Sequence, residues 1–251
     1  MAKTLFCIHG MWGGGYQWDN YRAFFEARGW RCETPYLRHH DVSPDAPPHP
    51  DLGITGLLDY AADLEAAVRA LPEKPVVVGH SMGGLLAQIL AARGLADKLV
   101  LLAPASPRGI TALTASVVKC FLPQFRTWGF WRKPNRPTFE QAVYAFLHLV
   151  PPAEQRALYD RLVHESGRAA FEIGLWPLDR RRASEVDPGK VTCPILAVAA
   201  EEDRIVPAKV VRKVAARYPG AQVRELPGHA HWLIGEPGWE EVAGLVANWL
   251  K

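Results

Sequence analysis

The chain has 251 residues, of which 49% are hydrophobic and 22% are charged, and its formal net charge is +3. This composition is typical of a globular protein of one or two domains, and it excludes a largely disordered chain. The charge is small and the basic residues form no stripe interleaved with aromatic ones, so the sequence does not predict a nucleic-acid-binding protein.

The chain carries no membrane, targeting or metal signal. The apolar run before His9 is too short for the core of a signal peptide, and no later run approaches the roughly 20 residues that a membrane helix needs. The four cysteines, Cys7, Cys32, Cys120 and Cys193, form no CxxC pair. We therefore predict a cytoplasmic protein with reduced thiols, without a metal or cofactor and without membrane insertion.

Strands and helices alternate over the first hundred residues. The predicted strands are 3–8, 30–37, 75–79 and 98–104, and the predicted helices are 16–28, 54–71 and 82–94, with a loop rich in Pro, His and Asp at 38–53. Most of these strands are continuously apolar, as strands buried on both faces of a parallel sheet are. The pattern predicts a parallel sheet with right-handed crossovers.

The pattern breaks after Ala105 and resumes with a strand at 193–200, a helix at 207–217, a strand at 221–226 and a helix at 239–250. We predict that 106–188 is a helical cap inserted into a core of 1–105 and 189–251. The cap helices are expected near 110–121, 138–149, 152–165 and 168–175.

The predicted cap has its own composition. It carries 12 Lys or Arg against 8 Asp or Glu, and it is rich in large aromatic residues that could line a pocket or fill the core. These residues are Phe121, Phe125, Trp128, Phe130, Trp131, Phe139, Phe146, Phe171 and Trp176.

The stretch PVVVGHSMGGLLAQIL, residues 75–90, passes directly from a strand to a helix at Ser81. Such a sharp corner leaves no room for neighbouring side chains, which explains Gly79 and Gly83. The corner presents the Ser81 hydroxyl at the N-terminus of a helix, where a developing negative charge is stabilised. Ser81 is therefore placed to attack a carbonyl group.

In this setting, GHSMGG resembles the nucleophile elbow of the α/β-hydrolase superfamily. The resemblance runs from CIHGMWGG to the final helix, while the cap matches in position only. It implies the α/β-hydrolase fold, a mostly parallel doubly wound sheet with a helical cap after the strand that follows the nucleophile helix. It also implies a triad in the chain order Ser, acid, His.

The resemblance identifies the acid as Asp203, three residues before the Val-Pro pair that follows a predicted strand. Glu201 and Glu202 remain competitors. Two histidines could serve as the base, and His231 is favoured because Trp232 follows it and Glu236 lies five positions later, as in relatives. His229 is the alternative, with a role in shaping the loop or supporting the triad.

The oxyanion hole needs two backbone donors. One is expected to be the amide of Met82, directly after the nucleophile. The resemblance of HGMWGGG to the superfamily's His-Gly loop implies that Met11 supplies the other, with Trp12 as a pocket wall. His9 and His80 are expected to bond to the backbone, and the His39, His40 and Asp41 group is expected to be a solvated loop.

These residues imply a serine hydrolase that cleaves a carboxylic ester with an apolar acyl part through an acyl-enzyme. A serine nucleophile argues against the dehalogenase and epoxide-hydrolase branches, which use aspartate. The same triad would also serve C–C bond, lactone, amide or thioester hydrolysis, or cofactor-free perhydrolysis. A non-catalytic ligand-binding member of the fold is the third alternative.

Overall fold

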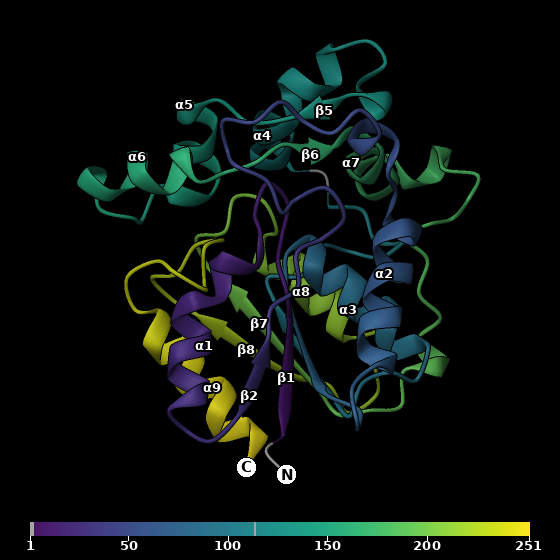
Figure 1. Ribbon diagram of the computed structural model, residues 1–251, viewed down its shortest axis with the longest axis vertical. Helices are drawn as coiled ribbons and strands as arrows, with labels where there is room; N and C mark the ends of the chain where they lie inside the picture. Colours follow the sequence, from purple (N-terminus) through teal and green to yellow (C-terminus); the bar gives the residue numbers. More distant parts are fainter. Residues whose placement is uncertain (1–2, 113) are drawn as a thin grey trace.

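The computed structural model describes residues 3–112 and 114–251, and it is built around one parallel sheet (Figure 1). The strand order is β2-β1-β3-β4-β7-β8, and every neighbouring pair in this sheet is parallel. The strands are β1 Thr4–Ile8, β2 Arg31–Glu33, β3 Val76–His80, β4 Lys98–Leu102, β7 Ile195–Ala200 and β8 Gln222–Leu226. The predicted α/β-hydrolase fold is confirmed.

The strand order reverses between β1 and β3. From β1 the chain moves outward to β2 at one edge, and it then returns to β3 on the other side of β1 and continues to β8. Connections leave such a point in opposite directions and open a crevice at the carboxyl ends of the strands. Ile8 pairs with Gly79 at these ends, so His9 and Ser81 both enter the crevice.

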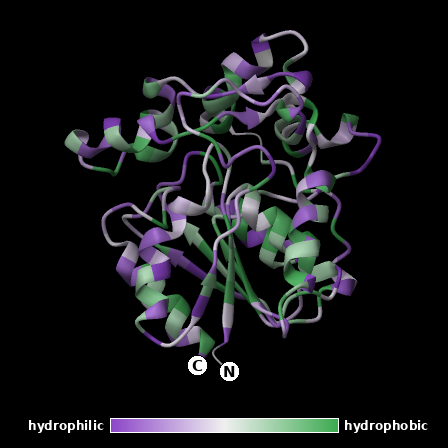
Figure 2. Cartoon of the chain, in the orientation of Figure 1, coloured by the Kyte–Doolittle hydropathy of each residue, from purple (hydrophilic) through white to green (hydrophobic). Residues whose placement is uncertain are grey.

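Helices cover both faces of the sheet (Figure 1). Helices α1 (Asp19–Glu26) and α9 (Trp239–Leu250) contact each other on one face, and α2 (Leu57–Arg69) contacts α3 (Met82–Ala92) on the other. Helix α8 (Ala208–Ala215) packs on β7 and β8. Hydrophobic residues concentrate where these helices meet the strands, as Figure 2 shows.

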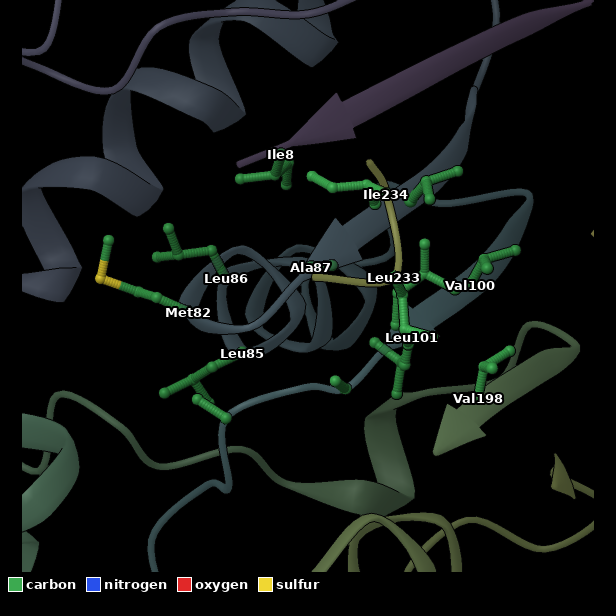
Figure 3. Packing of buried hydrophobic residues seen from close by; sticks show 14 of the residues in the cluster. Ile8, Met82, Leu85, Leu86, Ala87, Val100, Leu101, Val198, Leu233 and Ile234 are labelled. Carbon is green, nitrogen blue, oxygen red and sulfur yellow. The ribbon is translucent and has the colours of Figure 1, made fainter. Parts of the chain in front are cut away.

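Helix α3 is the most deeply buried helix of the core. Every residue from Met82 to Ala91 is buried, and Leu86 lies on the side of the helix toward Ile8 in Figure 3. Leu233 and Ile234, from the loop after β8, pack close to Val100 in the same cluster. Burying a leucine or isoleucine side chain stabilises the fold by about 1.5–3 kcal/mol. The first turn of α3 and the loop that carries His231 are therefore both anchored in the core.

A second group of elements lies beyond the carboxyl ends of the strands (Figure 1). Its helices are α4 Ala115–Arg126, α5 Phe139–Ala142, α6 Pro152–Asp160 and α7 Gly167–Gly174, with a π-helical turn at Val143–Leu147. Two short strands, β5 (Pro134–Asn135) and β6 (Glu165–Ser166), pair in antiparallel fashion between these helices. The sequence pattern did not predict this pair.

Short 3-10 turns connect the larger elements. They are Gly15–Trp18, Leu52–Ile54, Phe130–Arg132, Trp176–Leu178 and Pro188–Lys190. The turn Leu52–Ile54 contacts α7 and Phe130–Arg132, so part of the predicted loop 38–53 packs against the helices above the sheet.

Several predicted boundaries in the first half of the chain were wrong. Of the predicted strand 30–37, only residues 31–33 form β2. The strand ends there because Pro35 lacks an amide hydrogen and the Leu37 amide donates to His9 and not to a neighbouring strand. The predicted helix 16–28 begins as a 3-10 turn and continues as α1 only to Glu26.

The predicted helices above the sheet were also displaced. The helix expected at 110–121 is α4, which begins at Ala115 because the Thr114 hydroxyl accepts from the amide of Val117. The helix expected at 152–165 ends at Asp160, since Glu165 lies in β6. The helix expected at 138–149 is divided into α5 and the π-helical turn. Residue 113 and the side chain of Phe125, which belong to these predictions, lie outside the described residues.

Candidate active site

Ser81 occupies a strained turn between β3 and α3. Its φ of +53° and ψ of −120° lie in a region that non-glycine residues rarely adopt, at a cost of about 1–3 kcal/mol. The surrounding backbone holds this conformation. The Ser81 amide donates to Leu102, and the Ser81 carbonyl accepts from the amides of Gly84 at 2.9 Å and Ala105 at 2.8 Å.

The glycines around Ser81 are required by close backbone contacts. A Cβ atom on Gly83 would lie 2.1 Å from the carbonyl oxygen of Ile8, and one on Gly79 would lie 2.3 Å from that of Gly83. Both distances are shorter than any non-bonded contact. A Cβ on Gly10 would lie 3.0 Å from Cβ of Ser81, so the loop after β1 lies directly against the serine.

Asp203 and His231 form a buried pair at the same edge of the sheet. His231 Nδ1 donates to Asp203 Oδ2 at 2.7 Å, and Asp203 Oδ1 accepts from the amides of Ile205 at 2.7 Å and Val206 at 2.8 Å. The two amides fix the orientation of the carboxylate, and the carboxylate fixes the imidazole. Because Nδ1 carries the hydrogen, Nε2 of His231 is left as a proton acceptor.

The competing acids, Glu201 and Glu202, contribute backbone hydrogen bonds to the loop. The Glu201 amide donates to Leu226 and the Glu202 amide donates to His229, while both side chains are exposed. The carboxylate that meets the ring of His231 is thus that of Asp203.

His229 has a different partner from His231. Its Nδ1 lies 3.0 Å from Oε1 of Glu236, which also accepts from the amide of Ala230 at 2.8 Å. Burial raises the pKa of Glu236, although these hydrogen bonds act in the opposite direction. The glutamate five positions after His231 therefore closes the loop through the His229 ring and the Ala230 amide.

His80 supports the backbone of His231. His80 Nε2 donates to the His231 carbonyl at 2.7 Å, and the two rings lie 4.8 Å apart. Burial and the neighbouring His231 ring lower the pKa of His80 to about 3, so His80 is neutral near neutral pH. His9 also binds backbone as predicted, since its Nδ1 donates to Gly10 and its Nε2 accepts from Leu37.

The predicted oxyanion residues lie beside Ser81. Met82 opens α3 and Met11 follows the His9-Gly10 pair, and both line the cavity that contains Ser81. Trp12 lies in the left-handed region with a φ of +61°, and its indole nitrogen donates to Asn135 at 3.0 Å. The ring stacks on Phe121 and on Phe146. Trp12 thus forms a wall between the core and the elements above it.

Two chambers meet at Ser81. The larger has a volume of about 90 Å³ between α4, α7 and the sheet edge, and the smaller has about 30 Å³ beside His231. Among the predicted aromatic residues, Phe121 and Phe130 line the larger chamber, Phe146 lines the smaller, and Trp128 is 86% exposed.

A buried ion pair near the site was missed by the sequence analysis. His40, which we predicted to be solvated, is only 1% exposed, and its Nε2 donates to Glu165 of β6 at 3.1 Å. Its Nδ1 faces the Arg38 carbonyl at 2.9 Å, so both ring nitrogens meet acceptors. Glu165 also accepts from the Tyr60 hydroxyl at 2.8 Å. The error arose because a Pro-rich sequence indicates a loop but not whether another segment covers it.

The pair links the loop before α2 to the elements above the sheet. Burial alone would lower the pKa of His40, but Glu165 and the surrounding carbonyls raise it above its ordinary value. Burial alone would raise the pKa of Glu165, but His40, the Ser166 amide and the Tyr60 hydroxyl lower it. The Glu165 carbonyl also accepts from Asn135, the residue that binds Trp12. The cluster therefore supports one wall of the site.

Replacing Glu165 by glutamine should destabilise the protein by about 3 kcal/mol, because it leaves His40 buried without a counter-charge. The raised His40 pKa stabilises the fold below the ordinary histidine value, and this contribution is lost as the pH rises through the folded-state pKa. The lowered Glu165 pKa stabilises the fold above the ordinary glutamate value, and this is lost as the pH falls through the folded-state pKa.

Urea unfolding of wild type and Glu165→Gln would measure this difference, which should be largest at about pH 6 and smaller at about pH 9. The control is Glu185→Gln, which breaks an exposed ion pair with Arg182 and should change stability by less than about 1 kcal/mol. A pH-independent difference for Glu165→Gln would show that the ion pair does not stabilise the fold.

No helix within residues 3–112 and 114–251 is both long and apolar enough to cross a membrane. In the same ranges, no three His, Cys, Asp or Glu side chains come close enough together to hold a metal ion.

A doubly wound parallel sheet with a serine at the turn from strand to helix defines the class of the protein, a hydrolase of the α/β fold. Residues 5–245 match the model of the Alpha/beta hydrolase family, and the chain belongs to that family.

Three known proteins show how the chain relates to others. It is 28% identical over 243 residues to a putative carbamate hydrolase, RutD, of Klebsiella pneumoniae, covering 91% of this chain and 85% of the relative. It is 26% identical over 222 residues to a pimeloyl-[acyl-carrier protein] methyl ester esterase of Yersinia enterocolitica, covering 80% of each chain. The crystal structure of the Arabidopsis methylesterase MES16 superposes with a TM-score of 0.73 at 14% identity, covering 98% of both chains.

Proposed function

We propose that the protein hydrolyses carboxylic esters through an acyl-enzyme, with Ser81 as nucleophile, His231 as base and Asp203 as the acid that orients it. The observation that carries the proposal is the buried 2.7 Å contact between His231 and Asp203 in the loops beside the strained Ser81 turn. Ser81 and His231 also line the same small chamber. This is the set of groups that acyl transfer requires.

The reaction takes place in two steps. Ser81 Oγ attacks the ester carbonyl while Nε2 of His231 accepts its proton, and the amides of Met11 and Met82 stabilise the oxyanion. His231 then gives the proton to the leaving alcohol, and the acyl group stays on Ser81. In the second step His231 removes a proton from water, which attacks the carbonyl carbon of the acyl-enzyme; the bond from that carbon to Ser81 Oγ then breaks, His231 returns the proton to Oγ and the acid is released. Asp203 stabilises the imidazolium in both steps.

We further propose that residues 106–188 act as a lid over a core of 1–105 and 189–251. Supporting this division, α4 and α7 form the outer wall of the larger chamber, while Ser81, Asp203 and His231 all come from the loops of the sheet. A lid of this kind shields the site from bulk solvent, which strengthens the electrostatic interactions there, and it selects the acyl group.

The relatives favour acyl transfer to water but differ in the bond that is cleaved. One is named as a methyl ester esterase and another as a putative carbamate hydrolase. We favour an ester because the larger chamber is lined mainly by apolar groups, which suit an apolar acyl chain. Lactone, thioester, amide and C–C bond hydrolysis and perhydrolysis use the same groups, and they are alternatives that substrate profiling separates.

The proposal is tested with a fluorophosphonate probe and a panel of nitrophenyl esters, thioesters and lactones. We expect stoichiometric labelling that maps to Ser81, and turnover of esters with short to medium acyl chains. A folded protein that is not labelled and turns over no member of the panel would indicate a ligand-binding protein that retains the fold.

Replacing Asp203 by asparagine should lower kcat by about 10⁴-fold, the loss seen when the acid of a serine triad is replaced in this way. The amide would favour the wrong imidazole tautomer, because its nitrogen can donate to Nδ1. The measurement is steady-state hydrolysis of the best ester of the panel. Glu202→Gln is the matched control and should retain the wild-type rate. If Glu202→Gln is the crippled variant, the acid has been misassigned.

A further inference from the structure

The two chambers at Ser81 contain different parts of the proposed machinery. Met82 lines the larger chamber and does not line the smaller one. His231 lines the smaller chamber and does not line the larger one. Ser81 and Met11 line both, so a substrate carbonyl beside Ser81 has one chamber on either side of it.

This arrangement fixes which part of an ester enters which chamber. In the tetrahedral intermediate the carbonyl carbon bonds to Ser81 Oγ, the oxyanion, the leaving oxygen and the acyl carbon. The oxyanion must face the Met11 and Met82 amides. The leaving oxygen must face His231, because it takes the proton from Nε2 as the C–O bond breaks. The alcohol therefore extends into the smaller chamber, and the acyl chain extends into the larger one.

The chambers differ in size and in how they end. The larger has about 90 Å³ and continues between α4 and α7 past Phe130, Ile173 and Trp176. The smaller has about 30 Å³, and four of its lining residues, Gln17, Phe146, Leu162 and Trp232, also line an outer pocket of about 80 Å³. These side chains therefore stand between the smaller chamber and the outer pocket. The larger chamber leaves more room for a long acyl chain, whereas a long alcohol would meet these side chains.

The larger chamber is also uncharged. None of its described lining residues is Asp, Glu, Lys, Arg or His, although the region 106–188 carries an excess of basic residues. A carboxylate or ammonium group in the acyl chain would be buried there without a partner, which costs several kcal/mol. The basic excess of the cap therefore gives no selection for an acidic acyl group.

We propose that the substrate is an ester of a short alcohol with a larger, uncharged acid, whose acyl chain lies between α4 and α7. The inference rests on the proposed function and assigns the two sides of its substrate. Phe146 is the residue that limits the alcohol, and Ala170 of α7 lies where a larger side chain would shorten the acyl chamber.

Two isomeric esters test the orientation, methyl octanoate and heptyl acetate, with hydrolysis followed by proton release. They have the same formula and nearly the same hydrophobicity, so a difference reports which chain fits which chamber. We expect kcat/KM to be at least about tenfold higher for methyl octanoate, as expected when a pocket accepts or refuses several methylenes. Methyl hydrogen octanedioate, which adds a terminal carboxylate to the acyl chain, should be hydrolysed at least about tenfold more slowly than methyl octanoate.

Two variants test whether the preference between the two esters depends on the residues that line the chambers. Phe146→Ala should open the smaller chamber to the outer pocket and raise kcat/KM for heptyl acetate relative to methyl octanoate by about tenfold. Ala170→Phe should lower kcat/KM for methyl octanoate relative to methyl acetate by about tenfold. Phe139→Ala is the control, because Phe139 packs on Tyr159 and lines neither chamber, and it should leave both ratios as in wild type.

Equal rates for the two isomers, or a preference for heptyl acetate, would overturn the assignment of the chambers while ester hydrolysis stands. Ratios that do not respond to Phe146→Ala and Ala170→Phe would overturn it as well. Absence of turnover for all esters, together with absence of fluorophosphonate labelling, would overturn the proposed function and the inference with it.

Discussion

Replacement of Ser81 by alanine is expected to lower kcat for the best ester by about 10⁶-fold, the loss that follows removal of the nucleophile from a serine hydrolase. The variant keeps the oxyanion amides and both chambers, so it should still bind the substrate. It should also fold, because alanine fits the space of serine and the turn is held by backbone hydrogen bonds from Gly84 and Ala105. The measurement is steady-state hydrolysis, with circular dichroism to check the fold.

Ser106→Ala is the matched control for this experiment. Ser106 lines the larger chamber with Ser81, but its hydroxyl donates to the Ile110 carbonyl at 3.1 Å. Losing this hydrogen bond should cost about 1 kcal/mol of stability and leave most of the activity. If Ser81→Ala retained more than about a hundredth of the wild-type rate, the nucleophile would have to be another group.

Replacement of His231 by alanine should reduce kcat nearly as much as loss of Ser81, because the serine hydroxyl then has no base to accept its proton. Asp203 would also lose the donor to its Oδ2 atom, although its Oδ1 atom keeps the amides of Ile205 and Val206. The measurement is the pH profile of kcat in wild type and variant. The variant should lose the rise in rate that deprotonation of the base produces in wild type.

His229→Ala is the comparison that separates the two histidines. This change leaves Glu236 buried with the Ala230 amide as its remaining partner, so it should lower stability by about 1–3 kcal/mol. The rate of the folded variant should fall much less than that of His231→Ala. If His229→Ala lost the activity and His231→Ala kept it, the base would be misassigned even though the chain remains a hydrolase.

The positions of the candidate residues were predictable where the information is local. Gly79, Ser81 and Gly83 follow from the steric demands of one turn, and the close contacts at both glycines show those demands. Asp203 follows from its place after a strand. The preference for His231 was based on the adjacent Trp232 and on the spacing to Glu236, and the structure pairs that glutamate with His229 instead. The spacing between His231 and Glu236 therefore indicates how the loop after β8 is closed, and it does not indicate which histidine ring binds Asp203.

Other features depend on contacts between distant segments. β5 and β6 are each two residues long, so no periodicity marks them, and Glu165 pairs with His40 across 125 positions of the chain. A charged residue in a short polar segment usually indicates solvent exposure. Burial of this ion pair was therefore outside the reach of a sequence pattern.

The sequence by itself determined the succession of strands and helices in the core, the parallel sheet and the turn at Ser81, because hydrophobic periodicity and glycine sterics act over a few neighbouring residues. Only the tertiary structure decided which histidine meets Asp203, which segments cover the sheet edge and how the space at Ser81 is divided. These features are set by packing between segments more than 25 residues apart, such as Asp203 with His231, 28 residues later, and Trp12 with Asn135, 123 residues later. Such packing depends on the shape of the folded chain, which no local pattern encodes.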